Sequence, residues 1–402
     1  MDLVTGTPFW KHLDGQPHAY PPLRDEVSCE VLVIGGGISG ALVAHALVEA
    51  GIETILVDRR DVGTGSTAAS TALLQYEPDM PLWRLARLHG EADAVRCYHV
   101  CRDTLDDIRT LSRSLGACPD PAFTAHESLK LASRPRDVGA LRRECELRRT
   151  HGFDVAFVEG AQLRRETSLR HAGALLTREA ASMDAFAFTH ALLKRSEELG
   201  LQVFERTAVT SISQRGRTHL VHTHDRPAIH ARSIVVAAGY EAAGLLGRTW
   251  GSLHSTYALA TLPLPSFDGW PGNRLLWETA RPYFYARRTV DDRIIVGGYD
   301  EEFRDPRARD ALLPAKTAAL LRKLRSLFPG IECETGYAWT GTFAETPDTL
   351  PYIGRVPGRD GVYAALGYGG NGIVFSRISA GIIRDQILGR HNPHADLFHF
   401  ER

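Results

Sequence analysis

The sequence predicts an α/β protein that combines a discontinuous Rossmann-like dinucleotide-binding domain with an interleaved α+β domain built on an antiparallel sheet. Three observations predict this fold class. A Gly-x-Gly-x-x-Gly loop stands between a strand pattern and a helical pattern at residues 33–40. A second glycine-rich stretch, ALGYGGNGIVFS, occupies residues 365–376. Between them, residues 251–300 alternate polar and apolar positions around turn residues, which is typical of antiparallel strands.

The composition indicates a globular chain with a small-molecule partner. A length of 402 residues exceeds one ordinary core, so we expect two domains able to enclose a large cofactor. Apolar residues make up 44% of the chain, and the formal net charge is -1. A chain with so little net charge has no strong positive electrostatic potential that would attract nucleic acid or an anionic membrane, so neither is an expected partner.

The N-terminus and the cysteines favour a cytoplasmic protein. The first residues, MDLVTGTPFWKHLDGQ, lack the basic start and apolar core of a secretory signal, and no apolar run reaches the roughly 18 residues of a membrane span. Six cysteines are scattered without the density of a disulfide framework, which indicates a reducing compartment. Cys97 and Cys101 lie four residues apart, but no second ligand pair follows, so we expect no metal site.

The first elements form a βαβ unit. CEVLVIGG (29–36) is a buried-strand pattern, ISGALVAHALVEAG (38–51) has helical spacing, and ETILVD (53–58) is a second strand. A later apolar run, RSIVVAAGY (232–240), is predicted to lie beside these strands in a parallel sheet.

The middle of the chain predicts helices and strands in turn. The helices are expected at 81–116, 136–152 and 184–200, and the strands at 127–133 and 201–212. The arginines of 136–152 are expected to point to solvent.

The remaining elements complete both sheets. Alternating strands are predicted at 254–264, 281–290 and 293–300, followed by a helix at 312–328. GVYAALG (361–367) is then a strand that leads through YGGNG into a C-terminal helix. The domains therefore interleave. We assign residues 1–80, 155–245 and 335–402 to the dinucleotide-binding domain and residues 81–154 and 246–334 to the substrate domain.

The first glycine loop indicates dinucleotide binding. Gly35 permits a tight turn, Gly37 lets backbone approach a pyrophosphate, and Gly40 lets the helix pack closely on the strand. The free N–H groups at the helix N-terminus then face the phosphates. Asp58 ends the next strand, where it can accept hydrogen bonds from ribose hydroxyls and disfavours a 2′-phosphate. NAD and FAD both remain open from this loop alone.

The stretch VGTGSTAASTALLQYE (62–77) favours a cleft over a plain surface loop. Its small hydroxyl residues can hydrogen-bond a phosphate and a bound ring at close range, and the run leads directly into an apolar segment.

Six segments together carry a resemblance to a known family. They are VLVIGGGISGALVAHAL, ILVDRRDVGTGSTAAST, IVVAAG, RTVDDRIIVGGYD, TGTFAETPDTLPYIG and GYGGNGIVFSRISAGIIRDQI. In order and spacing they resemble the D-amino-acid-oxidase-like family of FAD-dependent oxidoreductases, which includes glycine, sarcosine and glutamylputrescine oxidases. The resemblance covers nearly the whole chain.

The resemblance implies an extended, non-covalently bound FAD. The ADP half is expected on the first glycine loop and the isoalloxazine under the second. Backbone at Val209 would face the adenine, Thr67 the pyrophosphate, and Ser70 and Thr71 the flavin. The residues expected to bind FAD are Gly35, Gly37, Ile38, Ser39, Gly40, Asp58, Arg59, Ser66, Thr67, Ser70, Thr71, Val209, Gly239, Gly369, Gly370, Asn371, Gly372 and Ile373.

The implied reaction is oxidation of a C–N bond. A small amine or amino acid would lose a hydride to flavin N5 and become an imine that water hydrolyses, with oxygen or another acceptor reoxidising the flavin. The alternatives are an FAD-binding subunit of an electron-transfer complex without its own substrate chemistry, and an NAD dehydrogenase.

Strand periodicity selects candidates for the substrate site. It places Tyr283, Tyr285 and Arg287 on one strand face, and Tyr257 on the face opposite His254. Tyr285, Arg287 and Tyr257 are the catalytic candidates, with ordinary sheet packing as the alternative for the two tyrosines. Phe343, Tyr368 and His254 are the expected pocket residues, although a structural role fits His254 better.

One departure from the family bears on the substrate. Amino-acid-oxidising relatives typically show G-x-R-P before TPD, and the arginine pairs the substrate carboxylate. This chain reads GTFAETPD and has Phe343 at that place. The departure favours an amine without an α-carboxylate unless Arg287 supplies the missing charge.

Overall fold

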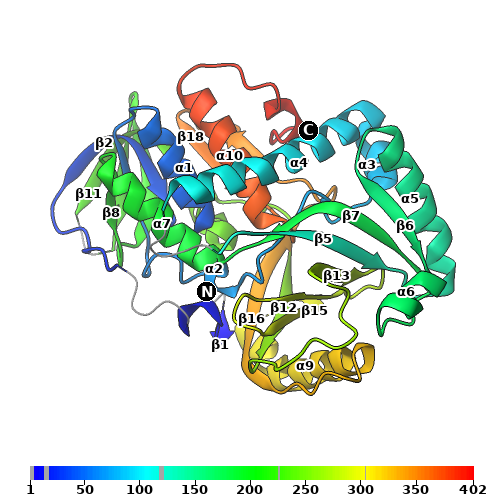
Figure 1. Ribbon diagram of the computed structural model, residues 1–402. Coiled ribbons are helices and arrows are strands. Elements are labelled where there is room, and N and C mark those ends of the chain that lie inside the picture. Colours follow the sequence, from blue (N-terminus) through cyan, green and yellow to red (C-terminus); the bar gives the residue numbers. More distant parts are fainter. Residues whose placement is uncertain (1–3, 13–17, 117–121, 225–226, 304) are drawn as a thin grey trace.

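Two sheets organise the protein. The computed structural model describes residues 4–12, 18–116, 122–224, 227–303 and 305–402. Figure 1 shows β2, β8, β11 and β18 together on the left, and the strands of a larger sheet on the right and below. The mixed α/β fold class predicted from the sequence is confirmed.

The smaller sheet, which we call the parallel sheet, has the order β17-β18-β11-β2-β3-β8. These strands are β17 (Tyr352–Arg355), β18 (Val362–Leu366), β11 (Ala228–Val236), β2 (Val27–Ile34), β3 (Thr54–Val57) and β8 (Gln202–Phe204). Neighbours from β18 to β8 pair in parallel, as their apolar runs predict. The antiparallel strands β9 (Val209–Arg215) and β10 (Thr218–Thr223) extend from β11. The sheet thus joins separated pieces of chain.

Helices α1 (Ile38–Glu49), α7 (Ala185–Glu198) and α10 (Gly372–Ile387) pack together beside this sheet, as Figure 1 shows. Residues 40–48 of α1 are all buried, because α1 packs on β2 and β3 as well as on both other helices. A helix that is apolar on every side is therefore the expected sequence here.

The larger sheet, which we call the large sheet, has the order β1-β16-β12-β15-β14-β13-β5-β7-β4, with β6 paired to β7. Its strands are β1 (Thr5–Gly6), β16 (Thr335–Glu345), β12 (Ser252–Thr261), β15 (Ile294–Glu302), β14 (Phe284–Arg288), β13 (Arg274–Glu278), β5 (Thr124–Leu131), β7 (Gly173–Ser182), β4 (Leu73–Gln75) and β6 (Val155–Glu159). Among the described pairs, β5 and β13 run parallel and the others antiparallel. Helix α9 (Pro306–Leu327) packs on β12, β15 and β16.

The helix predicted at 81–116 is two helices, α3 (Leu82–His89) and α4 (Glu91–Ser114). Gly90 separates them with φ +84, a conformation that breaks a helix and that glycine adopts without strain. In Figure 1, α3 lies at the right end of the molecule with α5 (Val138–Thr150) and α6 (Gly160–Glu166), and α4 extends from there across the centre of the view. The strand predicted at 201–212 is likewise divided, into β8 and β9.

The domain division predicted from the sequence does not coincide with the division of the strands between the two sheets. Strands β4, β6, β7 and β16 lie in the large sheet, although the sequence division placed them in the dinucleotide-binding domain. Alternation within a strand reveals its buried face but not its hydrogen-bonding neighbour, so sequence pattern could not assign these strands.

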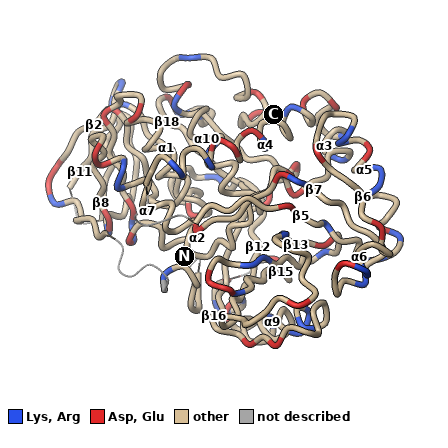
Figure 2. The backbone as a smooth tube through the Cα atoms, viewed as in Figure 1, with Lys and Arg blue, Asp and Glu red and all other residues tan. Residues whose placement is uncertain are grey.

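Charged residues are distributed over the whole molecule. Figure 2 shows Lys and Arg intermixed with Asp and Glu along the chain, in agreement with the net charge of -1. Among the described residues, no helix is both long enough and apolar enough to cross a membrane.

Candidate active site

A cavity of about 580 Å³ lies where the carboxyl ends of the parallel strands meet the large sheet. At one end it is lined by Asp58 and Val209, and at the other by Trp277, Tyr285 and Asp300. Ligands of open α/β sheets bind at this edge, because the loops that follow the strands leave a crevice there.

The first glycine loop is tightly packed. Gly35 has φ +116, and a Cβ there would lie 2.4 Å from the carbonyl oxygen of Ala237. A Cβ on Gly40 would lie 1.8 Å from the carbonyl oxygen of Gly35, so glycine is required for packing, and Gly40 does not line the cavity. Gly37 does line it, and the nearest atom to an added Cβ is Thr67 Oγ1 at 3.0 Å.

Asp58 is held by backbone at the end of β3. Its Oδ2 accepts the N–H of Gly36 at 2.6 Å, and its Oδ1 accepts the N–H of Arg60 at 2.7 Å. Burial raises the pKa of this carboxyl group, and the two N–H groups oppose the rise. Arg59, which also lines the cavity, forms an ion pair with Glu241.

Helix α2 (Ser66–Ala69) carries the predicted hydroxyl groups. Thr67 Oγ1 accepts the N–H of Ile38 at 2.9 Å and so joins α2 to the start of α1. Ser66 Oγ lines the cavity and is buried without a hydrogen-bond partner in the part of the chain that the structure describes. It is therefore available to a ligand.

Three side-chain donors hold the backbone carbonyl groups of the last residue of α2 and of the two residues after it. The indole of Trp339 donates to the oxygen of Ala69 at 2.9 Å, and the indole of Trp10 donates to that of Ser70 at 2.6 Å. Arg287 Nε donates to the oxygen of Thr71 at 2.8 Å.

Arg287 does not reach the cavity. Its Nη2 donates to the oxygen of Met183 at 3.0 Å, and its guanidinium lies 5.1 Å from the Trp10 ring centroid. The prediction that Arg287 contacts the substrate is wrong, because these carbonyl groups occupy its donors.

The second glycine loop closes the same cavity. The N–H of Gly370 donates to Asp79 Oδ2 at 2.6 Å, and a Cβ on Gly370 would lie 2.9 Å from Asp79 Oδ1. Ser39 of α1 and Ser376 of α10 are linked by a 2.7 Å hydrogen bond between their hydroxyl groups. The two glycine loops therefore face one cavity from adjoining helices.

Tyr285 lines the roof at a fixed position. It pairs with Gly297 of β15, and its ring lies across that glycine, where a Cβ would be 2.3 Å from the phenol oxygen. Burial raises the pKa of Tyr285 to about 12, so the phenol is protonated at neutral pH. Tyr283 also lines the cavity, and its hydroxyl donates to the backbone oxygen of Asp79 at 3.2 Å.

Tyr257 lies on the wrong side of the sheet for its predicted role. It is fully buried in a core shared with Leu259 and Phe284, whereas its neighbour Thr256 lines the cavity. The prediction of substrate contact is therefore wrong, because strand alternation turns Tyr257 toward α9.

Two of the three predicted pocket residues line the cavity. Phe343 and Tyr368 lie at the lining, while His254 lies behind it, stacked on Phe343 at 5.3 Å between ring centroids. His254 thus has the structural role that fits it better.

We call the end of the cavity that is lined by Trp277, Tyr285 and Asp300 the inner end, and none of its charged residues was predicted from the sequence. These lining residues are Glu77, Asp79, Arg281, Asp300 and Glu345. They come from loops and from strands of the large sheet, so no local motif unites them.

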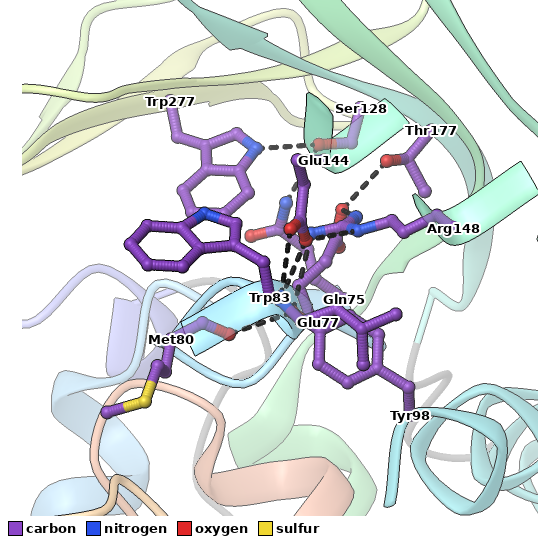
Figure 3. A network of polar contacts seen from close by, with 11 residues as sticks. Gln75, Glu77, Met80, Trp83, Tyr98, Ser128, Glu144, Arg148, Thr177 and Trp277 are labelled. Atoms are coloured by element: carbon purple, nitrogen blue, oxygen red, sulfur yellow. Dashed lines mark hydrogen bonds and ion pairs between the residues drawn. The ribbon is translucent and has the colours of Figure 1, made fainter. Parts of the chain in front are cut away.

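A buried network supports this end of the cavity (Figure 3). Arg148 is fully buried, and it contacts Glu77 at 2.6 Å and Glu144 at 2.7 Å. Thr177 donates to Glu77 at 2.7 Å, and the Trp277 indole donates to Ser128 at 3.0 Å. The expectation that arginines of this helix point to solvent is wrong for Arg148, because two carboxylates compensate its charge inside the protein.

Comparisons with known proteins identify the family. The model of a family described as FAD dependent oxidoreductase matches residues 30–386. The chain belongs to this family.

Individual relatives agree with that assignment. Glycine oxidase of Bacillus licheniformis is 28% identical over 373 residues, which cover 90% of this chain and 94% of the relative. A putative Rieske 2Fe-2S iron-sulfur protein, YhfW of Bacillus subtilis (strain 168), is 24% identical over 397 residues, covering 97% and 74%. The crystal structure of glycine oxidase from Geobacillus kaustophilus superposes with a TM-score of 0.78 at 20% identity and covers 93% of this chain and 99% of that one.

The residues present fit a non-covalent FAD. A Cβ added to Gly65, Gly239 or Gly244 would meet no atom within 4 Å, so at these lining positions the backbone borders open cavity. The unpartnered Ser66 hydroxyl and the Asp58 carboxylate offer polar partners along the same wall. None of the described cysteines lines the cavity.

Most of the predicted cofactor residues line this cavity. They are Gly35, Gly37, Ile38, Ser39, Asp58, Arg59, Ser66, Thr67, Ser70, Thr71, Val209, Gly239, Gly369, Gly370, Gly372 and Ile373. Gly40 and Asn371 do not, because both are buried behind the loops that they belong to. Across the described ranges, no group of three or more His, Cys, Asp or Glu side chains has a metal-binding arrangement.

Proposed function

We propose that this FAD-dependent oxidoreductase acts on a primary or secondary amine that lacks an α-carboxylate. Family membership makes the chain an enzyme that oxidises a C–N bond of a small amine or amino acid. The choice between these two classes depends on what the inner end of the cavity would bind.

The charge of the inner end supports this proposal. Besides Glu77, which Arg148 pairs, Asp79, Asp300 and Glu345 line it with three carboxylates, whereas Arg281 contributes one cation. Arg281 is exposed, donates to the backbone oxygen of Asp79 at 3.2 Å and lies 3.5 Å from the Tyr283 ring centroid. A site with net negative charge attracts an ammonium and repels a carboxylate.

The positions of Phe343 and Arg287 also support an amine substrate. Phe343 presents an aromatic ring where amino-acid-oxidising relatives carry an arginine, and Arg287 donates its hydrogen bonds to backbone carbonyl groups instead. A substrate carboxylate beside Phe343 would be buried without the arginine that offsets its desolvation in those relatives.

The protein and FAD contribute different parts of the reaction. FAD, when bound, supplies the acceptor for a hydride. The chain's side chains orient the C–N bond and exclude water, and the oxidised substrate leaves as an imine that water hydrolyses. The acceptor that reoxidises the flavin is oxygen or another oxidant, and the free, buried state of the five described cysteines supports a cytoplasmic location.

Matched pairs of compounds test the substrate class. Phenethylamine and butylamine are compared with phenylalanine and norvaline, in both enantiomers, by anaerobic bleaching of the flavin absorbance. We expect each amine to bleach the flavin at least about tenfold faster than its carboxylated counterpart, because one unpaired buried charge costs more than 1.4 kcal/mol. Faster bleaching by the amino acids would overturn the proposal. Absence of bleaching by all of them would favour the electron-transfer subunit.

A further inference from the structure

We propose that Asp300 is a catalytic residue that binds the substrate ammonium and accepts one of its protons. The inference rests on the proposed function, since it requires an amine that arrives protonated. Sequence pattern does not predict this role, because regular strand alternation would place Asp300 on the face opposite to the cavity.

A bulge in β15 turns Asp300 toward the cavity. Ser255 of β12 pairs with Glu301, but Tyr257, two residues later, pairs with Gly298, three residues back. Strand β15 therefore contains one extra residue at this point. Gly297 faces Tyr285 on the cavity side, and regular alternation would put residue 299 on that side as well.

The extra residue reverses the alternation. Tyr299 packs against the core on the opposite side, together with Val296, and Asp300 lines the cavity. Bulges next to active sites commonly re-aim a side chain in this way.

The bulge is held in a strained but well-defined form. Tyr299 has φ +55, which is a left-handed conformation that a bulky residue rarely adopts. Its N–H donates to the backbone oxygen of Tyr283 at 2.7 Å, and Gly298 before it has φ +120. Strain of this kind persists where the surrounding structure enforces it, and it is concentrated at functional sites.

Asp300 has a free acceptor in this position. Its Oδ1 is buried and has no hydrogen-bond partner within the described ranges, while the Thr256 hydroxyl interacts with the carboxyl group. An unpartnered buried oxygen on a cavity wall is an unusual feature that a cationic ligand would satisfy.

The charges around Asp300 decide how it titrates. Its pKa is raised to about 6, mainly by burial; Asp79 from the facing loop adds to the rise, while the Thr256 hydroxyl, Arg281 and His254 oppose it. Tyr283 and Tyr285, from the adjacent strand, stay protonated because burial raises their pKa. Above about pH 6 the group is therefore an anion, and it is a stronger base than an ordinary aspartate.

The proton transfer is balanced within the pair. One N–H bond of the substrate ammonium breaks, and an O–H bond forms on Asp300 Oδ1. The electron pair stays on nitrogen as the lone pair of the neutral amine, which is the form that can lose a hydride from its carbon. A charged pair thus becomes a neutral pair in a site shielded from water.

The experiment measures flavin bleaching by phenethylamine from pH 5.5 to 10. The variant is Asp300→Asn, and the control is Glu302→Gln, an exposed carboxylate on the same strand. At pH 7.5 we expect about a hundredfold slower bleaching in Asp300→Asn, within the range for loss of a general base. Near pH 10 the rate should recover to within about threefold, because roughly a quarter to a third of an amine with a pKa near that of lysine is then neutral.

A second measurement reports binding without turnover. Tert-butylamine has no hydrogen on the carbon next to nitrogen, so it binds without being oxidised, and its binding is followed by the change in flavin absorbance. We expect the dissociation constant to rise about tenfold in Asp300→Asn and to stay unchanged in Glu302→Gln, as a lost charge-assisted contact predicts. If Asp300→Asn does not retain FAD, Asp300→Ser replaces it.

The outcomes separate this inference from the proposed function. If wild type is bleached by amino acids and not by amines, the proposed function fails. If wild type is bleached by amines but Asp300→Asn has the same pH profile and the same affinity for tert-butylamine, Asp300 has no such role. A loss of rate that is equal at every pH also overturns the proton transfer.

Discussion

Three side-chain donors hold three successive backbone carbonyl groups at the wall of the cavity. Trp339, Trp10 and Arg287 bond Ala69, Ser70 and Thr71 in turn. Since Ser70 and Thr71 line the cavity, the donors fix the backbone that faces the cofactor. Arg287, which belongs to β14 of the large sheet, thus positions the backbone of Thr71.

Replacement of Arg287 by methionine should weaken FAD binding. The change leaves the carbonyl groups of Thr71 and Met183 without a donor, and each unsatisfied buried group costs about 1–3 kcal/mol. We expect roughly a tenfold or greater rise in the FAD dissociation constant, measured by flavin fluorescence, with the preference for amines over amino acids unchanged. Arg288→Met is the control, because Arg288 does not line the cavity and stacks on Phe267 instead. Selective loss of amino-acid oxidation in Arg287→Met would restore the carboxylate role to Arg287.

Two glycines of the first loop should respond differently to substitution. Gly37 has φ -79, which any residue can adopt, and an added Cβ would press only on the Thr67 side chain, at 3.0 Å. Gly37→Val should therefore lower the melting temperature of the apoprotein only slightly and abolish FAD retention. Gly40→Ala places a Cβ 1.8 Å from the oxygen of Gly35, so it should lower that melting temperature by several degrees. Differential scanning calorimetry and flavin content distinguish the two. Purification of Gly37→Val with full flavin would refute the role of the loop.

At the scale of elements, α5 is connected to the wall of the cavity by the ion pair between Arg148 and Glu77. The helix places this side chain between Glu77, which precedes α3, and Glu144, one turn earlier on α5. Glu144 Oε1 also accepts the N–H of Leu82 at 2.8 Å, at the start of α3. One guanidinium therefore connects a helix, the start of another helix and a cavity wall (Figure 3).

Loss of this guanidinium should be costly and dependent on pH. Arg148→Met leaves two buried carboxylates uncompensated, which typically costs about 3–5 kcal/mol. Burial alone would raise the pKa of Glu144, but Arg148 and the Leu82 N–H bring it below its usual value. In wild type, this group stabilises the fold above the unfolded pKa of about 4.3, and the contribution is lost as pH falls through the lower folded pKa.

Urea unfolding of Arg148→Met and wild type between pH 4 and 8 checks this expectation. Without Arg148, burial dominates and the folded pKa of Glu144 lies above the unfolded one, so the variant should recover part of its deficit as pH falls. Arg149→Met, on the exposed side of the same helix, is the control and should change stability by less than about 0.5 kcal/mol. A deficit that is the same at every pH would contradict the electrostatic account.

At the scale of the whole molecule, the cavity joins both sheets. Its walls come from the ends of β2, β3 and β11 and from β12, β14 and β15 of the large sheet. A ligand that fills it therefore contacts both halves of the fold, and its binding free energy stabilises them together.

Removal of FAD should lower the stability of the whole chain. At a free FAD concentration of 100 times the dissociation constant, the stabilisation is about 2.7 kcal/mol. The melting temperature should therefore rise with added FAD while a single transition is kept, and calorimetry of apoprotein titrated with FAD measures it. A transition confined to one part of the chain and insensitive to FAD would show that the halves unfold independently.

The sequence by itself determined the family, the parallel sheet and the two glycine loops that line the cavity. These features are local: the Gly35, Gly37 and Gly40 spacing, the Asp58 position and the Gly369–Gly372 turn are each encoded within one strand, turn and helix. Since every residue of such a motif lies near its partners in the chain, pattern alone identifies it. The missing arginine at Phe343 was visible for the same reason.

Only the tertiary structure decided which charged side chains line the cavity. Arg287 is engaged by carbonyl groups from Thr71 and Met183, which are distant in sequence, and Tyr257 faces α9 instead of the cavity. Asp300 reaches the cavity through one extra residue in β15, and a single-residue shift reverses every later side chain of a strand. Periodicity assumes unbroken alternation, so a bulge set by pairing with β12 and by a bond to Tyr283 lies beyond what it can predict.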